Sequence, residues 1–105
     1  MIRGTTPTYT FALSIDSASI RAIWITFKQA IKLDEDKVLT KTMDDGISYN
    51  GNTVSLTLTQ EETLSFKENI PIEIQGKVFT TDEKVMATSI IKDNCERILC
   101  EEVMA

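Results

Sequence analysis

The side chain that most often carries out acid–base chemistry near neutral pH, histidine, is absent from this sequence of 105 residues. Its absence removes the usual general base and excludes Ser–His–Asp and Cys–His catalytic groups. None of the four glycines lies in a GxGxxG or GxxxxGK phosphate-binding pattern. We therefore expect a protein that is not an enzyme, with no catalytic residue and no bound cofactor.

Carboxylates occur in short runs, at positions 34–36, 44–45, 61–62 and 101–102. Such runs in turns are usually solvated, and nothing in the sequence places two of them in the shared site that glycosidase chemistry requires. Calcium binding by Asp34, Asp36 and Asp44 is a better alternative. The spacing nevertheless lacks the glycine and terminal glutamate of an EF-hand loop, so we expect no metal site.

The two cysteines, Cys95 and Cys100, lie five residues apart near the C-terminus. On a helix this spacing separates them by about 140°, and on a strand it directs them to opposite faces. We therefore predict two buried, reduced thiols rather than a disulfide or a zinc site.

The charge balance restricts the class of partner. The chain has 11 basic and 16 acidic residues, a net charge of −5, and its basic residues are dispersed. This composition disfavours binding to nucleic acid or to an anionic membrane. No segment approaches the ~18 apolar residues of a membrane span, and no apolar region follows Arg3 as in a secretory signal. We predict one cytoplasmic domain over residues 1–105.

Alternation of apolar and polar residues predicts strands along most of the chain. Residues 9–15 alternate in this way, and residues 20–29 are apolar enough to suggest a central strand, with Ile20 and Trp24 on one face and Ile23, Ile25 and Phe27 on the other. A turn at residues 33–36 precedes a more polar strand at 38–43, which the MDDG turn closes. Asn50-Gly51 is the preferred pair for a type I′ turn with positive φ at both residues, so residues 47–58 predict a hairpin.

The second half of the chain begins with a short helical corner. Thr59 and Glu62 have the spacing of a capping box, and Leu64 and Phe66 follow as core contacts. A strand over residues 70–80 has Pro71 at its start or on its edge-facing side, and a bulge or a close backbone approach at Gly76. Residues 80–84 predict a hairpin turn into a strand at 85–92. The tail from residue 93 fits either a helix or a last strand.

Large aromatic and basic side chains on these strands are expected to serve structural roles. Tyr9 and Tyr49 fit core anchors better than a ligand-stacking site, and Trp24 fits a core anchor or a packing face better. Lys28, Lys41 and Lys77 are expected to point outward, where they aid solubility and protect strand edges. About seven short strands and one helical corner predict an all-β, immunoglobulin-like antiparallel β-sandwich, with the corner crossing between its sheets.

Three stretches resemble a known group of proteins: MIRGTTPTYTF at the start, LTQEETLSF in the middle and IEIQGKVFTTDEKVMATSII near the end. They look like small Gram-positive prophage proteins encoded among tail and baseplate genes, similar to the N-terminal β-sandwich domain of baseplate upper proteins. The resemblance implies a non-enzymatic tail or baseplate component, assembled in the bacterial cytoplasm and carried in a virion or phage-tail-like particle. Its implied partners are other tail proteins or copies of itself.

An alternative function remains open, a cytoplasmic phage-encoded accessory protein that binds a host protein or a small ligand. The resemblance also points to Arg3, Gly4, Thr5, Thr6 and Pro7 as a candidate docking segment. Equally, these residues are simply the approach to the first strand, with Pro7 holding Thr6 extended. On the docking hypothesis, deletion of residues 1–6 leaves the melting temperature largely intact and abolishes partner binding.

Overall fold

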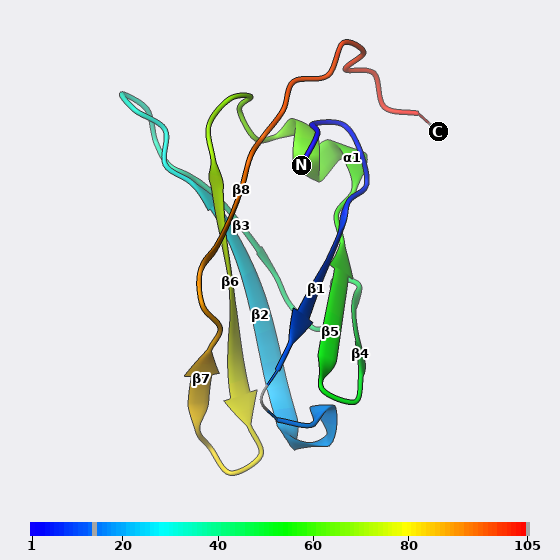
Figure 1. The fold of residues 1–105 in the computed structure, drawn as a ribbon, viewed down its shortest axis with the longest axis vertical. Coiled ribbons are helices and arrows are strands. Elements are labelled where there is room, and N and C mark those ends of the chain that lie inside the picture. Colours follow the sequence, from blue (N-terminus) through cyan, green and yellow to red (C-terminus); the bar gives the residue numbers. More distant parts are fainter. Residues whose placement is uncertain (14, 105) are drawn as a thin grey trace.

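The computed structural model describes residues 1–13 and 15–104. In chain order the described elements (Figure 1) are β1 (Thr8–Ala12), the 3-10 turn η1 (Ser17–Ser19), β2 (Ile20–Gln29), β3 (Lys37–Lys41), β4 (Ile47–Asn50), β5 (Thr53–Thr57), α1 (Gln60–Leu64), β6 (Ile72–Thr80), β7 (Val85–Ala87) and β8 (Ile91–Asp93).

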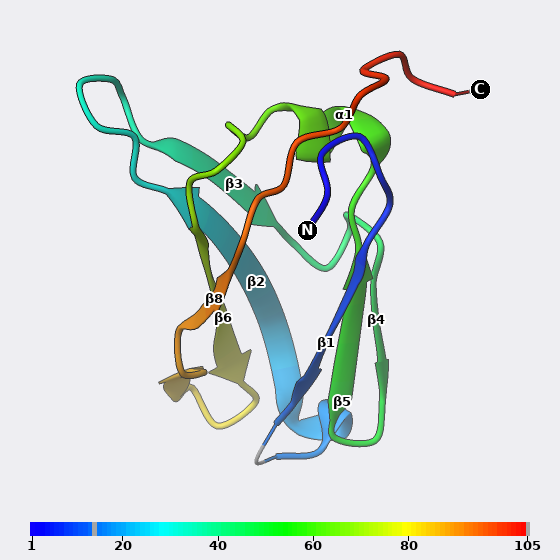
Figure 2. The ribbon, with the colours of Figure 1, turned by 45° about the horizontal axis from the view of Figure 1, so that its top comes forward.

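The strands form two antiparallel sheets, which confirms the predicted all-β sandwich (Figures 1 and 2). One sheet has the order β1-β5-β4, and the other has the order β3-β2-β6-β7, with β8 also paired to β6. As predicted, β2 is central and α1 joins strands of different sheets. This is the B-E-D and C′-C-F-G order of immunoglobulin-type sandwiches. No described strand occupies position A, beside β1.

The core lies between the two sheets, where period-two alternation places the apolar side chains of both. Phe27, Ile25, Ile23, Val54, Leu56, Leu58, Ile72 and Ile74 are almost completely buried there, together with Phe66 after α1. Gln29 is also buried, and its amide is satisfied: Nε2 donates to the carbonyls of Lys67 and Ile70, and Oε1 accepts from the Lys67 N–H. Burial of this polar group is therefore compensated.

One position in β2 differs from the predicted pattern. Ile20 was expected on the same face as Trp24, but Ile20 is buried and Trp24 is exposed. The register between β2 and β6 shifts between Ile20 and Ala22, so Arg21 is an extra residue. A bulge of this kind reverses the side-chain alternation on one side of it.

The predicted hairpin at residues 47–58 is present, but its turn differs by one residue. Asn50 pairs with Thr53, so the two turn residues are Gly51 and Asn52. Gly51 has φ of 60°, and neither Asn50 nor Asn52 has positive φ. Positive φ at only the first turn residue is the pattern of type II′, which takes glycine there, rather than type I′.

The C-terminal third contains two further departures from expectation. The strand predicted at 85–92 is divided into β7 and β8, both paired to β6. Between them, Thr88 turns toward β6, where its Oγ1 accepts a hydrogen bond from the Gly76 N–H at 3.0 Å. This is the close approach predicted at Gly76, because a Cβ there would lie 3.3 Å from Thr88 Cγ2. From residue 94 to 104 the tail is neither helix nor strand, apart from a single bridge between Glu96 and Ile2.

Candidate interaction surface

The N-terminal segment packs against α1 through the side chain of Arg3. Its guanidinium donates from Nη2 to the Leu64 carbonyl at 3.0 Å and from Nε to the Phe66 carbonyl at 2.7 Å. Leu64 is the last residue of α1, so Arg3 satisfies carbonyl groups that a helix leaves unpaired at its C-terminal end. Nη1 also pairs with the exposed carboxylate of Glu101 at 2.8 Å.

Gly4 and Thr5 join the same contact through Thr63, a buried residue of α1. Thr63 Oγ1 accepts from the Gly4 N–H and donates to the Thr5 carbonyl, both at 2.9 Å. Gly4 has φ of 75°, which favours glycine, and a Cβ on it would press against Leu64 Cδ2 at 3.3 Å.

These contacts change the expectation for the candidate docking segment, residues 3–7. Polar groups of Arg3, Gly4 and Thr5 are engaged within the chain, while Thr6 is exposed and Pro7 leads directly into β1. Deletion of residues 1–6 is therefore expected to lower the melting temperature. The sequence alone predicted a melting temperature that stays largely unchanged.

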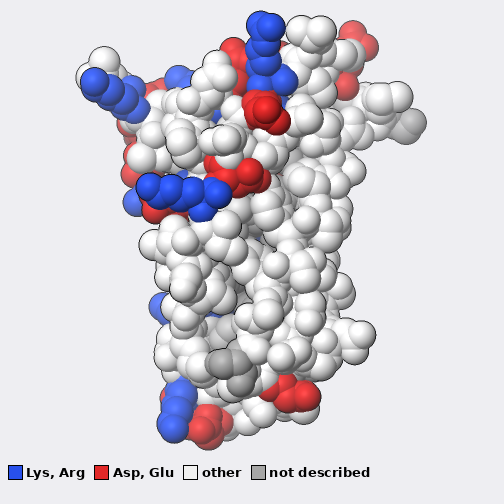
Figure 3. Space-filling view, viewed as in Figure 1, with Lys and Arg blue, Asp and Glu red and all other residues white. Residues whose placement is uncertain are grey.

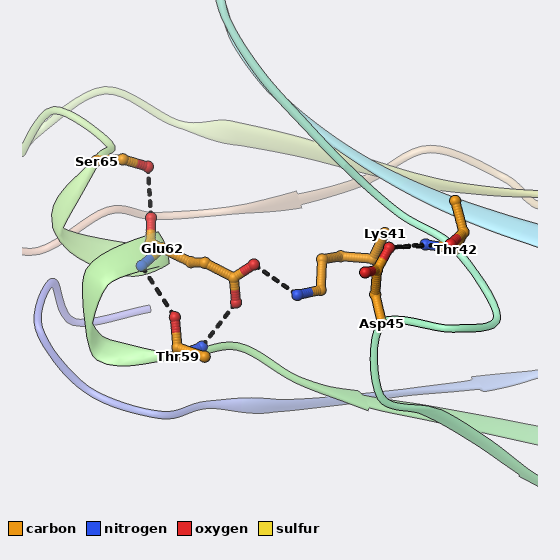
Figure 4. A network of polar contacts seen from close by, with 6 residues as sticks. All are labelled: Lys41, Thr42, Asp45, Thr59, Glu62 and Ser65. Carbon is orange, nitrogen blue, oxygen red and sulfur yellow. Dashed lines mark hydrogen bonds and ion pairs between the residues drawn. The ribbon is translucent and has the colours of Figure 1, made fainter.

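A second polar network lies at the start of α1 (Figure 4). The predicted capping box is present: Glu62 N–H donates to Thr59 Oγ1 and Glu62 Oε1 accepts from the Thr59 N–H. Glu62 Oε2 also accepts from Lys41 Nζ at 2.5 Å. Lys41 therefore points inward between the sheets, whereas the sequence predicted an outward, exposed side chain; Lys28 and Lys77 are exposed as predicted.

Burial and hydrogen bonding shift the pKa of the Glu62 carboxyl group in opposite directions. Burial alone raises the pKa of Glu62, but the hydrogen bonds from Lys41 and Thr59 outweigh it, and the pKa lies below its ordinary value. Asp93 behaves similarly, because the Met1 amine and the Tyr9 hydroxyl both donate to its Oδ2. Burial, followed by Asp93, raises the pKa of Tyr9 far above its ordinary value. These groups stabilise the fold.

The residues considered for metal binding and thiol chemistry are dispersed. Asp34 pairs with Lys67 and Asp36 with Lys28, and within the described residues no three potential ligands are grouped for a metal ion. Both cysteines are free: Cys95 is buried as predicted, but Cys100 is exposed, because the tail leaves the sandwich before reaching it.

The outer face of the five-stranded sheet carries an apolar surface that we call the Trp24 face, made of Ala22, Trp24, Phe79, Val85 and Ala87. Cross-strand register places Phe79 between Ala22 and Val85, and Lys77 between Trp24 and Ala87. Trp24 is 53% exposed and Val85 is 60% exposed. The sequence predicts a core anchor or a packing face at Trp24, whereas Phe79 and Val85 join this face only through the pairing of β6 with β2 and β7.

The Trp24 face has a shallow groove and a charged margin. The groove has a volume of about 260 Å³, below the range of roughly 300–1,000 Å³ typical of small-molecule pockets. At the margin, the Arg21 guanidinium lies 5.5 Å from the centre of the Phe79 ring and 4.0 Å from Glu83. An exposed aromatic surface with a polar rim has the composition of a protein-contact surface.

Comparison with known proteins places the chain in no family. No family model matches it, and no curated protein has significant sequence similarity to it. Within the described residues, none of the helices has the length and apolar character needed to cross a membrane.

Proposed function

We propose that this chain is a non-enzymatic structural component of a phage or prophage tail or baseplate, acting through protein–protein contacts. The observation that carries the proposal is the Trp24 face, where aromatic and aliphatic side chains are exposed together on the outer face of one sheet. Tryptophan is the residue type most enriched among interface residues of high binding energy. The three stretches that resemble prophage tail and baseplate proteins support the particular assembly.

The Trp24 face also favours a particular kind of partner surface. Lys77 lies between Trp24 and Ala87, so a complementary surface is apolar and brings a carboxylate to the lysine. A second copy docked face to face through a two-fold axis would instead bring two such lysines together. The face therefore suits another tail protein better than another copy.

Particle incorporation tests the function directly. Tail particles are purified from the bacterium that encodes the chain, and the protein is detected by quantitative immunoblot against purified standards. We expect it in particles at a fixed ratio to other tail proteins. Its consistent recovery in the soluble fraction would contradict the proposal and favour an accessory binding protein.

A pair of variants tests the surface. Trp24→Ser is expected to lower incorporation about 30-fold, corresponding to a contact of about 2 kcal/mol. Leu99→Ser is the matched control, since Leu99 is an exposed apolar residue on the C-terminal segment, and its incorporation should equal that of the unaltered chain. Equal incorporation of both variants would exclude the Trp24 face as the contact.

A further inference from the structure

Strand β1 lies at the edge of the three-stranded sheet, and only β5 among the described strands pairs with it (Figure 1). Leu58 N–H donates to the Pro7 carbonyl, and Leu13 N–H donates to the Asn52 carbonyl. Bonded and non-bonded pairs alternate in an antiparallel ladder, so the backbone groups of residues 7, 9, 11 and 13 face β5. Those of Thr8, Thr10 and Ala12 therefore point away from the sheet.

The edge of β1 also lacks the features that usually prevent pairing with other chains. Edge strands are commonly protected by lysine, by proline, or by being very short. Lys37 and Lys41 lie on the edge strand β3, and β7 and β8 have three residues each. The edge strand β4 has four residues, whereas β1 has five, none of them charged. It is the longest uncharged edge among the described strands.

A groove lies beside the C-terminal end of this edge, between the end of β1 and β7. Leu13 and Ile15 line one side, Val78 and Met86 line the other, and its volume is about 190 Å³. For comparison, an apolar cavity of about 150 Å³ can hold a benzene molecule. Met86 and Ile91 pair with the buried residues Val78 and Ile74, yet they are 37% and 45% exposed. The inner face of the five-stranded sheet is therefore incompletely covered here.

Charge distribution restricts what can cover this region. In Figure 3, charged side chains gather at the upper and lower ends of this face, and the middle is uncharged except at its margin. The groove residues named above carry no charge. A segment that binds in the groove is therefore complementary to it only if its inward side chains are uncharged. A free edge with an uncharged groove beside it is complementary to an extended, uncharged strand.

We propose that β1 and this groove receive an extended segment of a partner protein, which completes the sandwich at position A. The segment alternates uncharged outward residues with apolar inward ones, and one inward side chain of leucine or phenylalanine size fills the groove. A second copy of β1 is a poorer match. In antiparallel self-pairing, its inward residues Tyr9 and Phe11 remain packed in their own core and leave the groove empty.

A synthetic peptide with the sequence of residues 52–58 provides a probe with this alternation. Amide signals of isotope-labelled protein are followed by NMR as peptide is added to about 1 mM, a range that detects weak complexes. We expect shifts and slowed hydrogen exchange at Thr8, Thr10 and Ala12. The control peptide carries lysine in place of its three apolar residues and should produce no change. Equal binding of both peptides, or no binding of either, would overturn the proposal.

Two protein variants locate the site. Thr10→Pro removes an edge N–H that does not bond β5, and Met86→Lys places a charge in the groove; each should weaken binding about tenfold or more. Ile90→Lys, outside the groove residues, is the control for added charge and should bind normally. Unchanged binding by both Thr10→Pro and Met86→Lys would exclude this site.

The remaining outcomes separate this inference from the proposed function. Trp24→Ser should bind the peptide normally, because Trp24 lies on the outer face of the five-stranded sheet, whereas the groove is lined by Val78 and Met86 on its inner face. Chemical-shift changes confined to the Trp24 face or to β4 would contradict the inference. They would leave unaffected the proposal that the Trp24 face mediates incorporation into tail particles. Concentration-dependent protection of the Thr10 amide without peptide would show that a second copy occupies the edge, and would overturn the choice of partner.

Discussion

Arg3 donates a hydrogen bond of 3.0 Å to the carbonyl oxygen of Leu64, the residue that ends α1. The same guanidinium reaches the Phe66 carbonyl, so a side chain near the N-terminus completes a helix about 60 residues later. An arginine fork suits two neighbouring acceptors, and a cation is favourable at a helix C-terminus. The contact gives the N-terminal segment a structural role.

Replacement of Arg3 tests that role. Arg3→Ala is expected to lower the free energy of unfolding by about 2 kcal/mol, because hydrogen bonds from a charged donor to two partly buried carbonyls are lost. Urea denaturation followed by Trp24 fluorescence measures the change. Arg97→Ala, in the exposed tail, should change stability by less than about 0.5 kcal/mol. A loss of the same size in both variants would show that Arg3 has no special role.

The Lys41–Glu62 contact predicts a dependence of stability on pH. The pKa of Glu62 in the folded protein lies below its ordinary value of 4.5, so the carboxylate stabilises the fold above that pH. This contribution is lost as the pH falls below 4.5 toward the folded pKa. Denaturation at pH 7 and pH 3 should therefore show a larger loss for the unaltered chain than for Glu62→Gln.

The neighbouring glutamate provides the control for this experiment. Asp93 and Asp45 also have lowered pKa values, so the unaltered chain loses stability in acid for several reasons. Glu61→Gln alters an exposed carboxylate of the same helix and should keep the full pH dependence. If Glu62→Gln loses as much stability in acid as Glu61→Gln does, the network in Figure 4 contributes nothing.

The turn at Gly51 predicts different effects for two adjacent valine substitutions. Gly51 has φ of 60° with open space around its Cβ position, so Gly51→Val should cost about 2 kcal/mol from backbone strain alone. Asn50 is in β4 with negative φ, so Asn50→Val should be nearly neutral. Thermal denaturation distinguishes the turn types, since a type I′ turn at Asn50-Gly51 would make both variants unstable.

The two cysteines should react at very different rates. Cys95 is buried, and burial raises the pKa of its thiol, whereas Cys100 is exposed. The thiolate is the reactive form of cysteine. With an aromatic disulfide reagent, the native protein should therefore rapidly release one equivalent of the coloured thiolate product. The second equivalent should appear only in denaturant. Cys100→Ser should abolish the rapid phase. Rapid release of two equivalents from the native protein would contradict the burial of Cys95.

Much of the local structure could be predicted because its causes lie within a few residues. Alternation places Ile23, Ile25 and Phe27 in the core, and the spacing of Thr59 and Glu62 is sufficient for the capping box. The hairpin was also predictable, but its turn type was not. A shift of one residue in pairing changes which residues form the turn, and cross-strand packing decides that register.

Features that join distant segments could not be predicted in this way. Lys41 points inward because it pairs with Glu62, and Ile20 lies on the inner face because a bulge shifts the register between β2 and β6. The exposure of Cys100 depends on where the tail leaves the sandwich. None of these partners is adjacent in sequence, so side-chain periodicity carries no information about them.

By itself, the sequence determined the class of fold, the faces of its main strands and the absence of histidine chemistry, because these depend on composition and local periodicity. Only the tertiary structure decided that Trp24, Phe79 and Val85 form one exposed face, and that the backbone edge of β1 lies beside an uncharged groove. Both surfaces are assembled from strands far apart in the chain. Their composition follows from sheet order and register, which long-range packing determines.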